Sequence, residues 1–202
     1  TFVWEPNRHP PLAVLARAHR VTGGRRYAVA VADQLRSWLD QCPFGMGMNW
    51  RSPLELAVRL INWVWVIDLV RDSGVFDGDL WRRLMESAYL HGWDVARKYS
   101  RGSSANNHLV GELAGVFVGA SYFAQWPGAS AMRDRAGRML CEEIFRQSHA
   151  DGGGAEQGFG YHGFVLQFYI VAGLVGRLKG WEFPAEYWAR VEKMLELSGK
   201  LC

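Results

Sequence analysis

Residues 106–125 read NNHLVGELAGVFVGASYFAQ, and this stretch decides the class of fold. After its first three residues it is almost entirely apolar, so a helix of this sequence would be buried on all sides. Its glycines and alanines would let neighbouring helices approach closely. The polar loop 100–104 precedes it and Trp126-Pro127-Gly128 ends it. The stretch therefore predicts a buried helix in the middle of the chain.

Helical periodicity continues outward from this stretch in both directions. A helix that starts after Ser52 carries Pro53 and Glu55 in its first turn, which is a typical start signal. The other helices are predicted, in chain order, at 10–20, 26–40, 78–99, 130–149, 159–179 and 184–198. No segment predicts a strand.

About eight helices joined by short connections form antiparallel hairpins, as in an α/α toroid or a solenoid. The sequence has no fixed repeat, which disfavours the solenoid. Hairpins of this number are too few to close a toroid. The predicted fold class is therefore all-α, an incomplete α/α toroid, with residues 1–202 forming a single domain of a longer protein.

Composition excludes several classes of function. The net charge of +3 among 202 residues is too small to indicate nucleic-acid binding. Three cysteines without a CxxC pair predict neither a disulfide framework nor a zinc site. We expect no signal peptide at the start and no apolar run long enough to cross a membrane. Ten tryptophans are unusual, and flat aromatic rings serve both cores and carbohydrate-binding clefts.

Three segments concentrate polar and aromatic side chains where a loop meets a helix. The first is 47–55, followed by Arg59 on the helix; the second is 103–108; the third is 151–162. In the first, Glu55 and Arg59 are four residues apart. They could form an ordinary ion pair on a helix surface, or they could brace the loop while Trp50 stacks on a sugar ring.

The second segment predicts a site for an anion. Ser103 or Ser104 can cap the following helix, which places Asn107 and His108 beside its free backbone N–H groups. The positive end of the helix dipole favours a carboxylate there and disfavours a charged imidazole. A neutral His108 can act as a base or donate a hydrogen bond. The alternative is that Asn106 and Asn107 only cap the helix while His108 packs.

Two further patterns in these segments are rejected as sites. His108 and Glu112 are four residues apart, but no third metal ligand accompanies them at a suitable spacing. Glycines 158, 160 and 163 spell G-x-G-x-x-G, but a dinucleotide site needs a strand before this motif and a helix precedes it. The glycines would instead let backbone and ligand approach closely, with Tyr161 and His162 displayed near the start of a helix. The alternative is that Tyr161 is a core tyrosine with a satisfied hydroxyl.

Together the three segments resemble the heparinase II/III-like polysaccharide lyases. The matching motifs are Asn49-Trp50-x-Ser52-x-x-Glu55-x-Ala57-x-Arg59, then Ser103-Ser104-Ala105-Asn106-Asn107-His108-Leu109-x-Gly111-Glu112, then Asp151-Gly152 through Glu156-Gln157 to Tyr161. The resemblance extends from about residue 10 to residue 180, and the order and approximate separations of the motifs fit as well.

The resemblance implies cleavage of uronic-acid-containing glycans by β-elimination. The catalytic residues would be Asn107, which binds the uronate carboxylate, His108, which neutralises it or acts as a base, and Tyr161, which serves as base, acid or both. The substrate-binding residues would be Asn49, Trp50, Arg59, Asn106, Glu156, Gln157 and His162. We expect no metal and no cofactor in this domain.

This chain departs from the family in one respect, because nothing in it resembles the family's C-terminal β-sandwich. We therefore expect the rest of the parent chain to supply that domain, with an acidic polysaccharide as substrate and neither nucleic acid nor a membrane as partner. The expected location is periplasmic or secreted, with the cytoplasm as the alternative. Three other functions stay open: a non-catalytic glycan-binding module, a structural scaffold, and a glycoside hydrolase, which would need two opposed carboxylates.

Overall fold

The computed structural model describes residues 4–156 and 158–201. These residues form helices and loops, and within the described ranges the only extended pairing is an isolated bridge between Ser148 and Gly154. The α-helices are α1 (Trp4–Asn7), α2 (Pro10–Thr22), α3 (Arg25–Gln41), α4 (Pro53–Val70), α5 (Gly78–Arg97), α6 (Asn107–Tyr122), α7 (Ala129–Arg146), α8 (Phe159–Leu178) and α9 (Ala185–Leu201). Short 3-10 turns lie at η1 (Met48–Trp50), η2 (Arg71–Ser73) and η3 (Gly102–Ser104).

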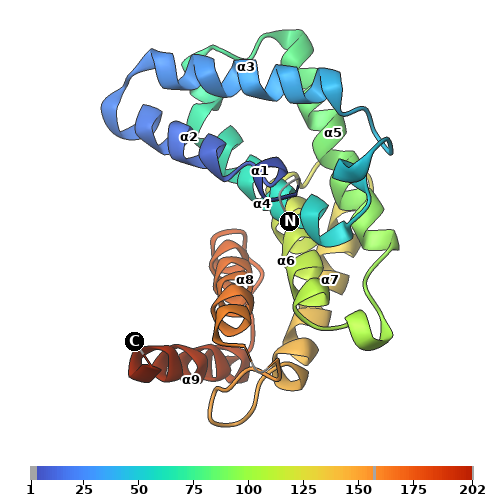
Figure 1. Ribbon diagram of the computed structural model, residues 1–202, viewed down its shortest axis with the longest axis vertical. Helices are drawn as coiled ribbons and strands as arrows, with labels where there is room; N and C mark the ends of the chain where they lie inside the picture. The colour runs from blue at the N-terminus through green and yellow to red at the C-terminus, as the bar shows by residue number, and fades with distance from the viewer. Residues whose placement is uncertain (1–3, 157, 202) are drawn as a thin grey trace. The chain divides into compact units, whose positions relative to one another are not determined.

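The chain divides into two compact units, residues 1–95 and 96–202, and each is described by itself. In the first unit α2 packs against both α3 and α4, as the blue and teal helices of Figure 1 show. Most of α4 is buried, because its sequence is apolar around nearly the whole helix. The prediction of one domain over residues 1–202 stays a prediction.

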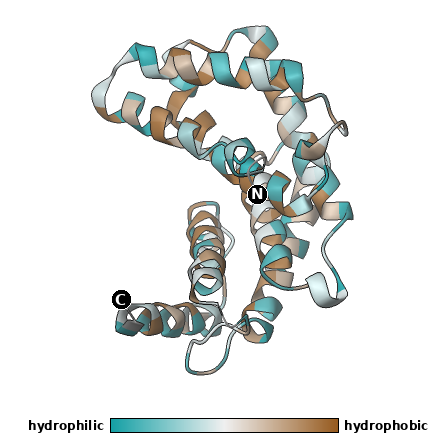
Figure 2. Cartoon of the chain, viewed as in Figure 1, coloured by the Kyte–Doolittle hydropathy of each residue, from teal (hydrophilic) through white to brown (hydrophobic). Residues whose placement is uncertain are grey.

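In the second unit α6 is the central helix and packs against α7 and α8, while α9 packs against α8 (Figure 1). Every residue of α6 from Leu109 to Ser121 is buried, in agreement with a sequence that is mostly apolar there (Figure 2). Small residues also allow close contact between helices α8 and α9. A Cβ at Gly173 of α8 would lie 2.4 Å from the ring of Trp188, so the indole occupies the space that a side chain would need.

The predicted helices match the observed ones to within a few residues at their ends, and only the single turn α1 was not predicted. Two details of the helix starts differ from the prediction. Ser52 is at the N-cap position of α4, but its hydroxyl makes no capping bond. The cap of α6 is Asn106 and not Ser103 or Ser104, because the serines belong to the 3-10 turn η3 that precedes the helix.

Helix α8 contradicts the expectation that no run is long and apolar enough to cross a membrane. Among the described residues it is the one helix that passes a test of length and composition, with a mean hydropathy of 1.3. A core helix passes the same test. In this structure Tyr169 and Ala172 of α8 are fully buried within the unit that α8 forms with α6 and α9.

Candidate functional site

At the start of α6, Asn106, Asn107 and His108 of the second motif lie in different environments. Asn106 caps the helix, because its side-chain oxygen accepts a hydrogen bond of 3.0 Å from the backbone N–H of His108. Asn107 is only 5% exposed, whereas the side chain of His108 is open to solvent. Asn106 therefore has the capping role foreseen in the alternative interpretation, and His108 does not pack in the core.

Asn107 is held by an acid from a distant part of the chain. Its side-chain amide nitrogen donates to both carboxylate oxygens of Glu156, at 2.8 Å each. Glu156 is in the loop before α8, so this contact joins the second motif to the third. A hydrogen bond from an amide to a carboxylate is stronger than a neutral one, and a partly buried pair of this kind fixes both side chains.

The loop that carries Glu156 is anchored at both ends. Gln147, at the end of α7, accepts a backbone bond of 2.8 Å from Ala155, and its side chain donates to the carbonyl of Ala105 at 2.7 Å. Gln147 thus ties the loop to Ala105, the residue before the N-cap of α6. Gln147 carries no signal of this role in the sequence, because nothing in its local sequence distinguishes it from other helix-end glutamines.

Helix α9 holds the same loop from the other side. Arg190 donates to the carbonyl of Ser148 at 2.7 Å. Gly152 has a φ of +94°, and a Cβ there would lie 2.2 Å from the carbonyl oxygen of Lys193. Only glycine fits this position, since the backbone conformation and the close approach both exclude a side chain.

Tyr161 and His162 are adjacent in the first turn of α8 but face different surroundings. Tyr161 is 55% exposed, which excludes its interpretation as a core tyrosine. His162 is buried, and its Nε2 lies 3.1 Å from both the carbonyl of Met194 and the hydroxyl of Ser198 in α9. Glu156, Tyr161 and His162 line one small hollow. Gln157 lies outside the described residues.

The first motif folds into the interior of the other unit. Arg59 is fully buried, and its guanidinium donates to the carbonyl of Asn7 at 2.5 Å, to Nε2 of His91 at 2.9 Å and to the carbonyl of Asn49 at 3.1 Å. It also lies over the ring of Trp38 at 4.7 Å. Arg59 therefore braces the η1 loop, as one of the two interpretations of the motif expected.

The expected pair between Glu55 and Arg59 is replaced by a longer-range one. Glu55 accepts two hydrogen bonds from Arg8, at 2.6 and 2.7 Å. Trp50 is 7% exposed and packs at a ring-centroid distance of 4.4 Å from His91, so its faces are covered within this unit. The substrate contacts expected of Trp50 and Arg59 stay predictions.

Burial keeps the two histidines of this aromatic cluster neutral. Nδ1 of His9 accepts a hydrogen bond of 2.9 Å from Trp63, and burial, with the nearby charge of Arg59, lowers the pKa of His9 to about 3. The same two causes hold the pKa of His91 well below its usual range. Burial also lowers the pKa of Arg59 itself to about 10, so Arg59 is the one charged member of the three at neutral pH.

The acids that a hydrolase would require are already engaged or exposed. Glu112 is buried and accepts 2.7 Å bonds from the backbone and hydroxyl of Ser100, so it anchors the loop before α6. Asp151 accepts a bond from the backbone of Gly153 in its own loop. Among the described residues no three metal-ligand side chains gather, and His108 and Glu112 differ in burial.

The structure thus joins Asn107, Glu156 and Tyr161 around one loop and hollow, with His108 exposed at the same helix start. It groups Asn49 with Arg59 in the other unit. The roles assigned to these residues stay predictions. Two supporting groups, Arg8 and His91, carry no signal in the sequence, because their roles depend on partners more than thirty residues away.

Comparison with known proteins identifies a family. The family model described as heparinase II/III N-terminus matches residues 2–201. A heparin-sulfate lyase from Bacteroides stercoris is 25% identical over 215 residues, covering 95% of this chain and 32% of that protein. A heparin-sulfate lyase from Bacteroides thetaiotaomicron is 24% identical over 168 residues, covering 81% of this chain and 24% of that protein. The chain spans about a third or less of the length of these curated relatives.

Solved structures of heparinase III and of a heparan sulfate lyase have a fold similar to that of this chain. A heparinase III gene product has a TM-score of 0.76 at 25% identity, over 96% of this chain and 33% of its own. The heparan sulfate lyase HepC from Pedobacter heparinus has a TM-score of 0.78 at 22% identity, and the match covers 96% of this chain and 31% of that chain. Another heparinase III has a TM-score of 0.83 at 16% identity, and the match covers 96% of this chain and 30% of that chain. The last two likenesses show the fold alone. These results confirm the predicted fold class, all-α of the incomplete α/α toroid type.

Proposed function

Because this chain belongs to the heparinase II/III family, through the N-terminal domain of that family, we propose that it forms the helical part of a polysaccharide lyase. The substrate is a glycan that contains uronic acid, and the reaction is β-elimination. The observation that carries the proposal is the contact between Asn107 and Glu156, which brings the amide motif and the loop before Tyr161 to one place.

β-Elimination is difficult because the C5 proton is removed next to a carboxylate that is already negative. The electrons left at C5 form an enolate-like system with the carboxyl group, and then expel the sugar oxygen at C4 as the C4–O bond breaks. The proton leaves to a base and a proton is given to the departing oxygen. Hydrogen-bond donors aimed at the uronate carboxylate stabilise this intermediate, and stabilisation of this kind is usually the largest single contribution to catalysis.

In this proposal Asn107 and His108 are those donors. Both lie in the first turn of α6, where free backbone N–H groups and the helix dipole favour an anion. The exposed side chain of His108 can reach a bound ligand, and Asn107 is already fixed in orientation by its partner.

Tyr161 is proposed as the base, the acid toward the leaving oxygen, or both. Its side chain is 55% exposed and lines the same hollow as Glu156. A phenol can accept the C5 proton as phenolate and can return a proton to the leaving sugar. The remainder of the parent protein, which this chain does not include, would complete the cleft around these groups.

Glu156 imposes a condition on this mechanism. It occupies the amide nitrogen that a uronate carboxylate would use. Two carboxylates cannot share one amide without strong repulsion. When a uronate binds, Glu156 therefore either turns away or shares a proton with the substrate.

The test is to incubate uronate polymers with the full-length protein that contains this chain, and to follow the ultraviolet absorbance of the 4,5-unsaturated product. Tyr161→Phe keeps the ring and removes the hydroxyl, so absorbance should stop rising while circular dichroism stays unchanged. Normal turnover by that variant would remove Tyr161 from the mechanism. Binding of the polymer by the unaltered protein without any absorbance change would indicate a glycan-binding module and overturn the lyase.

A further inference from the structure

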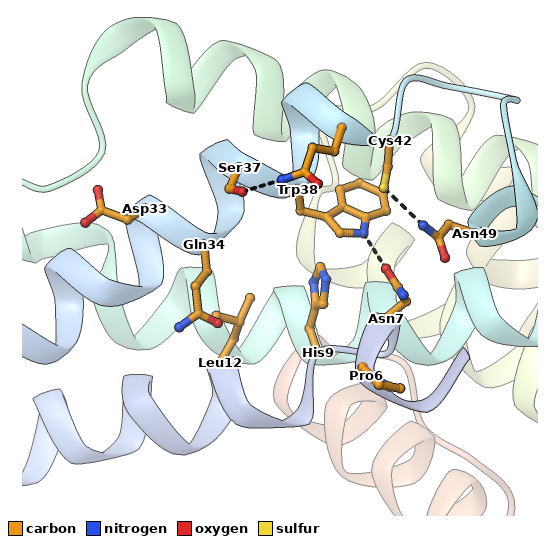
Figure 3. Close-up of a pocket in the computed structure, with 11 residues that line it drawn as sticks. Pro6, Asn7, His9, Leu12, Asp33, Gln34, Ser37, Trp38, Cys42 and Asn49 are labelled. Carbon is orange, nitrogen blue, oxygen red and sulfur yellow. Dashed lines mark hydrogen bonds between the residues drawn. The ribbon is translucent and has the colours of Figure 1, made fainter. Parts of the chain in front are cut away.

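The unit formed by residues 1–95 contains a hollow that belongs to neither the α6 start nor the Tyr161 turn. It lies between α1, α2, α3 and η1, and has a volume of about 570 Å³ (Figure 3). That volume is within the range of small-molecule sites. Its lining includes five amide or hydroxyl side chains: Asn7, Gln34, Ser37, Gln41 and Asn49.

The walls of this hollow are fixed from behind by buried groups. Arg59 donates to the backbone carbonyls of both Asn7 and Asn49, which come from different segments. The indole N–H of Trp38 donates to the side-chain oxygen of Asn7 at 2.8 Å, a bond drawn in Figure 3. Arg59 and Trp38 are both buried, so two polar walls are held at a set distance by interior groups.

The charge of the lining selects against anions. Asp33, with its side chain 68% exposed, lines the hollow, and none of the described lining residues is a lysine or arginine. Arg36 lies 3.8 Å from the carboxylate of Asp33 without lining the hollow, and the buried Arg59 behind the hollow has its three guanidinium nitrogens bonded to the protein. His9, which also lines the hollow, accepts a bond from Trp63 and faces inward to the aromatic cluster.

Amide side chains both donate and accept hydrogen bonds, which matches the hydroxyl and acetamido groups of an uncharged sugar. Pro6 and Leu12 supply an apolar part of the lining, suited to a methyl group or to the C–H face of a sugar ring. We propose that this hollow binds a neutral, N-acetylated hexosamine residue. The proposal rests on the proposed function for its ligand class, since it takes the ligand to be part of a glycan.

The experiment measures sugar binding by saturation-transfer difference NMR, on the full-length protein with Tyr161→Phe so that nothing is cleaved. The probes are N-acetylglucosamine and its dimer, compared with N-sulfoglucosamine and glucuronate. We expect saturation transfer to the neutral sugars and little to the two anions. Absence of transfer to the neutral sugars, or equal transfer to the anions, would overturn the proposal.

Two variants locate the binding. Gln34→Ala with Ser37→Ala removes two exposed lining groups from α3, and should weaken binding of the neutral sugar about tenfold if each hydrogen bond contributes its usual share. The matched control, Gln167→Ala with Ser130→Ala, removes the same two chemical groups from exposed positions in the other unit and should leave binding unchanged. Equal binding by both double variants would place the sugar elsewhere.

Asp33→Asn tests the selectivity. It removes the negative charge at the hollow and should raise the binding of glucuronate relative to N-acetylglucosamine several-fold. An unchanged ratio would contradict the role of Asp33. Because binding is measured without turnover, the result does not depend on whether Tyr161 is the catalytic group, and either proposal can fail without the other.

Discussion

The amide nitrogen of Asn107 lies 2.8 Å from each carboxylate oxygen of Glu156, although 49 positions of sequence separate the two residues. A carboxylate of the protein therefore occupies the donor that the proposed mechanism assigns to a carboxylate of the substrate.

Glu156→Gln should improve the binding of an acidic glycan. The change keeps the shape of the side chain but removes the charge that repels a uronate at Asn107, so KM should fall about three- to tenfold. The measurement is steady-state absorbance kinetics on the full-length protein. Glu186→Gln, at an exposed position of α9, is the control and should leave KM unchanged. A higher KM in the Glu156 variant would show that this carboxylate helps to bind substrate.

Gly152→Ala should loosen the loop that positions Glu156. The new Cβ would meet the backbone of Lys193 at 2.2 Å, and the φ of +94° is unfavourable for alanine, so unfolding should become easier by about 2 kcal/mol or more. Urea unfolding provides the measurement. Gly160→Ala, in the first turn of α8 with open space around it, should be neutral or slightly stabilising. Similar losses in both variants would contradict this account of the loop.

Arg59→Met should be among the most destabilising single changes in the chain. It leaves the carbonyls of Asn7 and Asn49 without their donor and opens a gap beside Trp38, a loss of roughly 3 kcal/mol or more. Arg36→Met removes surface ion pairs with Asp77 and Asp33 and should cost at most about 1 kcal/mol. The free energies of unfolding of the two variants can be compared in urea. A small loss for Arg59 would mean that the aromatic cluster closes around the vacancy.

Acid should destabilise the protein through His9. In the folded chain burial lowers its pKa to about 3, whereas the usual value is 6.5. Between these two values the unfolded chain binds a proton that the folded chain does not, so stability is complete above pH 6.5 and falls as the pH drops toward 3. The slope from this group approaches about 1.4 kcal/mol per pH unit.

The measurement is urea unfolding between pH 7 and pH 4.5, for the unaltered protein and for His9→Asn, whose amide can still accept a bond from Trp63. The variant should show a shallower decline. The comparison is needed because Glu112 acts in the opposite direction: burial raises its pKa, so its contribution to stability grows as the pH falls. Parallel curves for the two proteins would exclude His9 as a cause of the acid sensitivity.

Much of the fold could be predicted from local patterns. The apolar stretch at 106–125 is the buried helix α6, and the start signal at Pro53 begins α4 as expected. The sequence leaves the cap of α6 open between Ser103 or Ser104 and Asn106, because serine and asparagine have the same capping chemistry. Only the backbone of the turn at Gly102–Ser104 shows which of them is at the boundary.

The sequence by itself determined an all-α chain, its helix boundaries to within a few residues, and the motifs that resemble the heparinase II/III family. It could do so because helix periodicity and motif order are properties of neighbouring residues. Only the tertiary structure decided that Glu156 is the partner of Asn107, that Arg59 is an interior brace, and that amide side chains surround a hollow. Those facts depend on contacts between residues far apart in the chain, whose distances no local pattern contains.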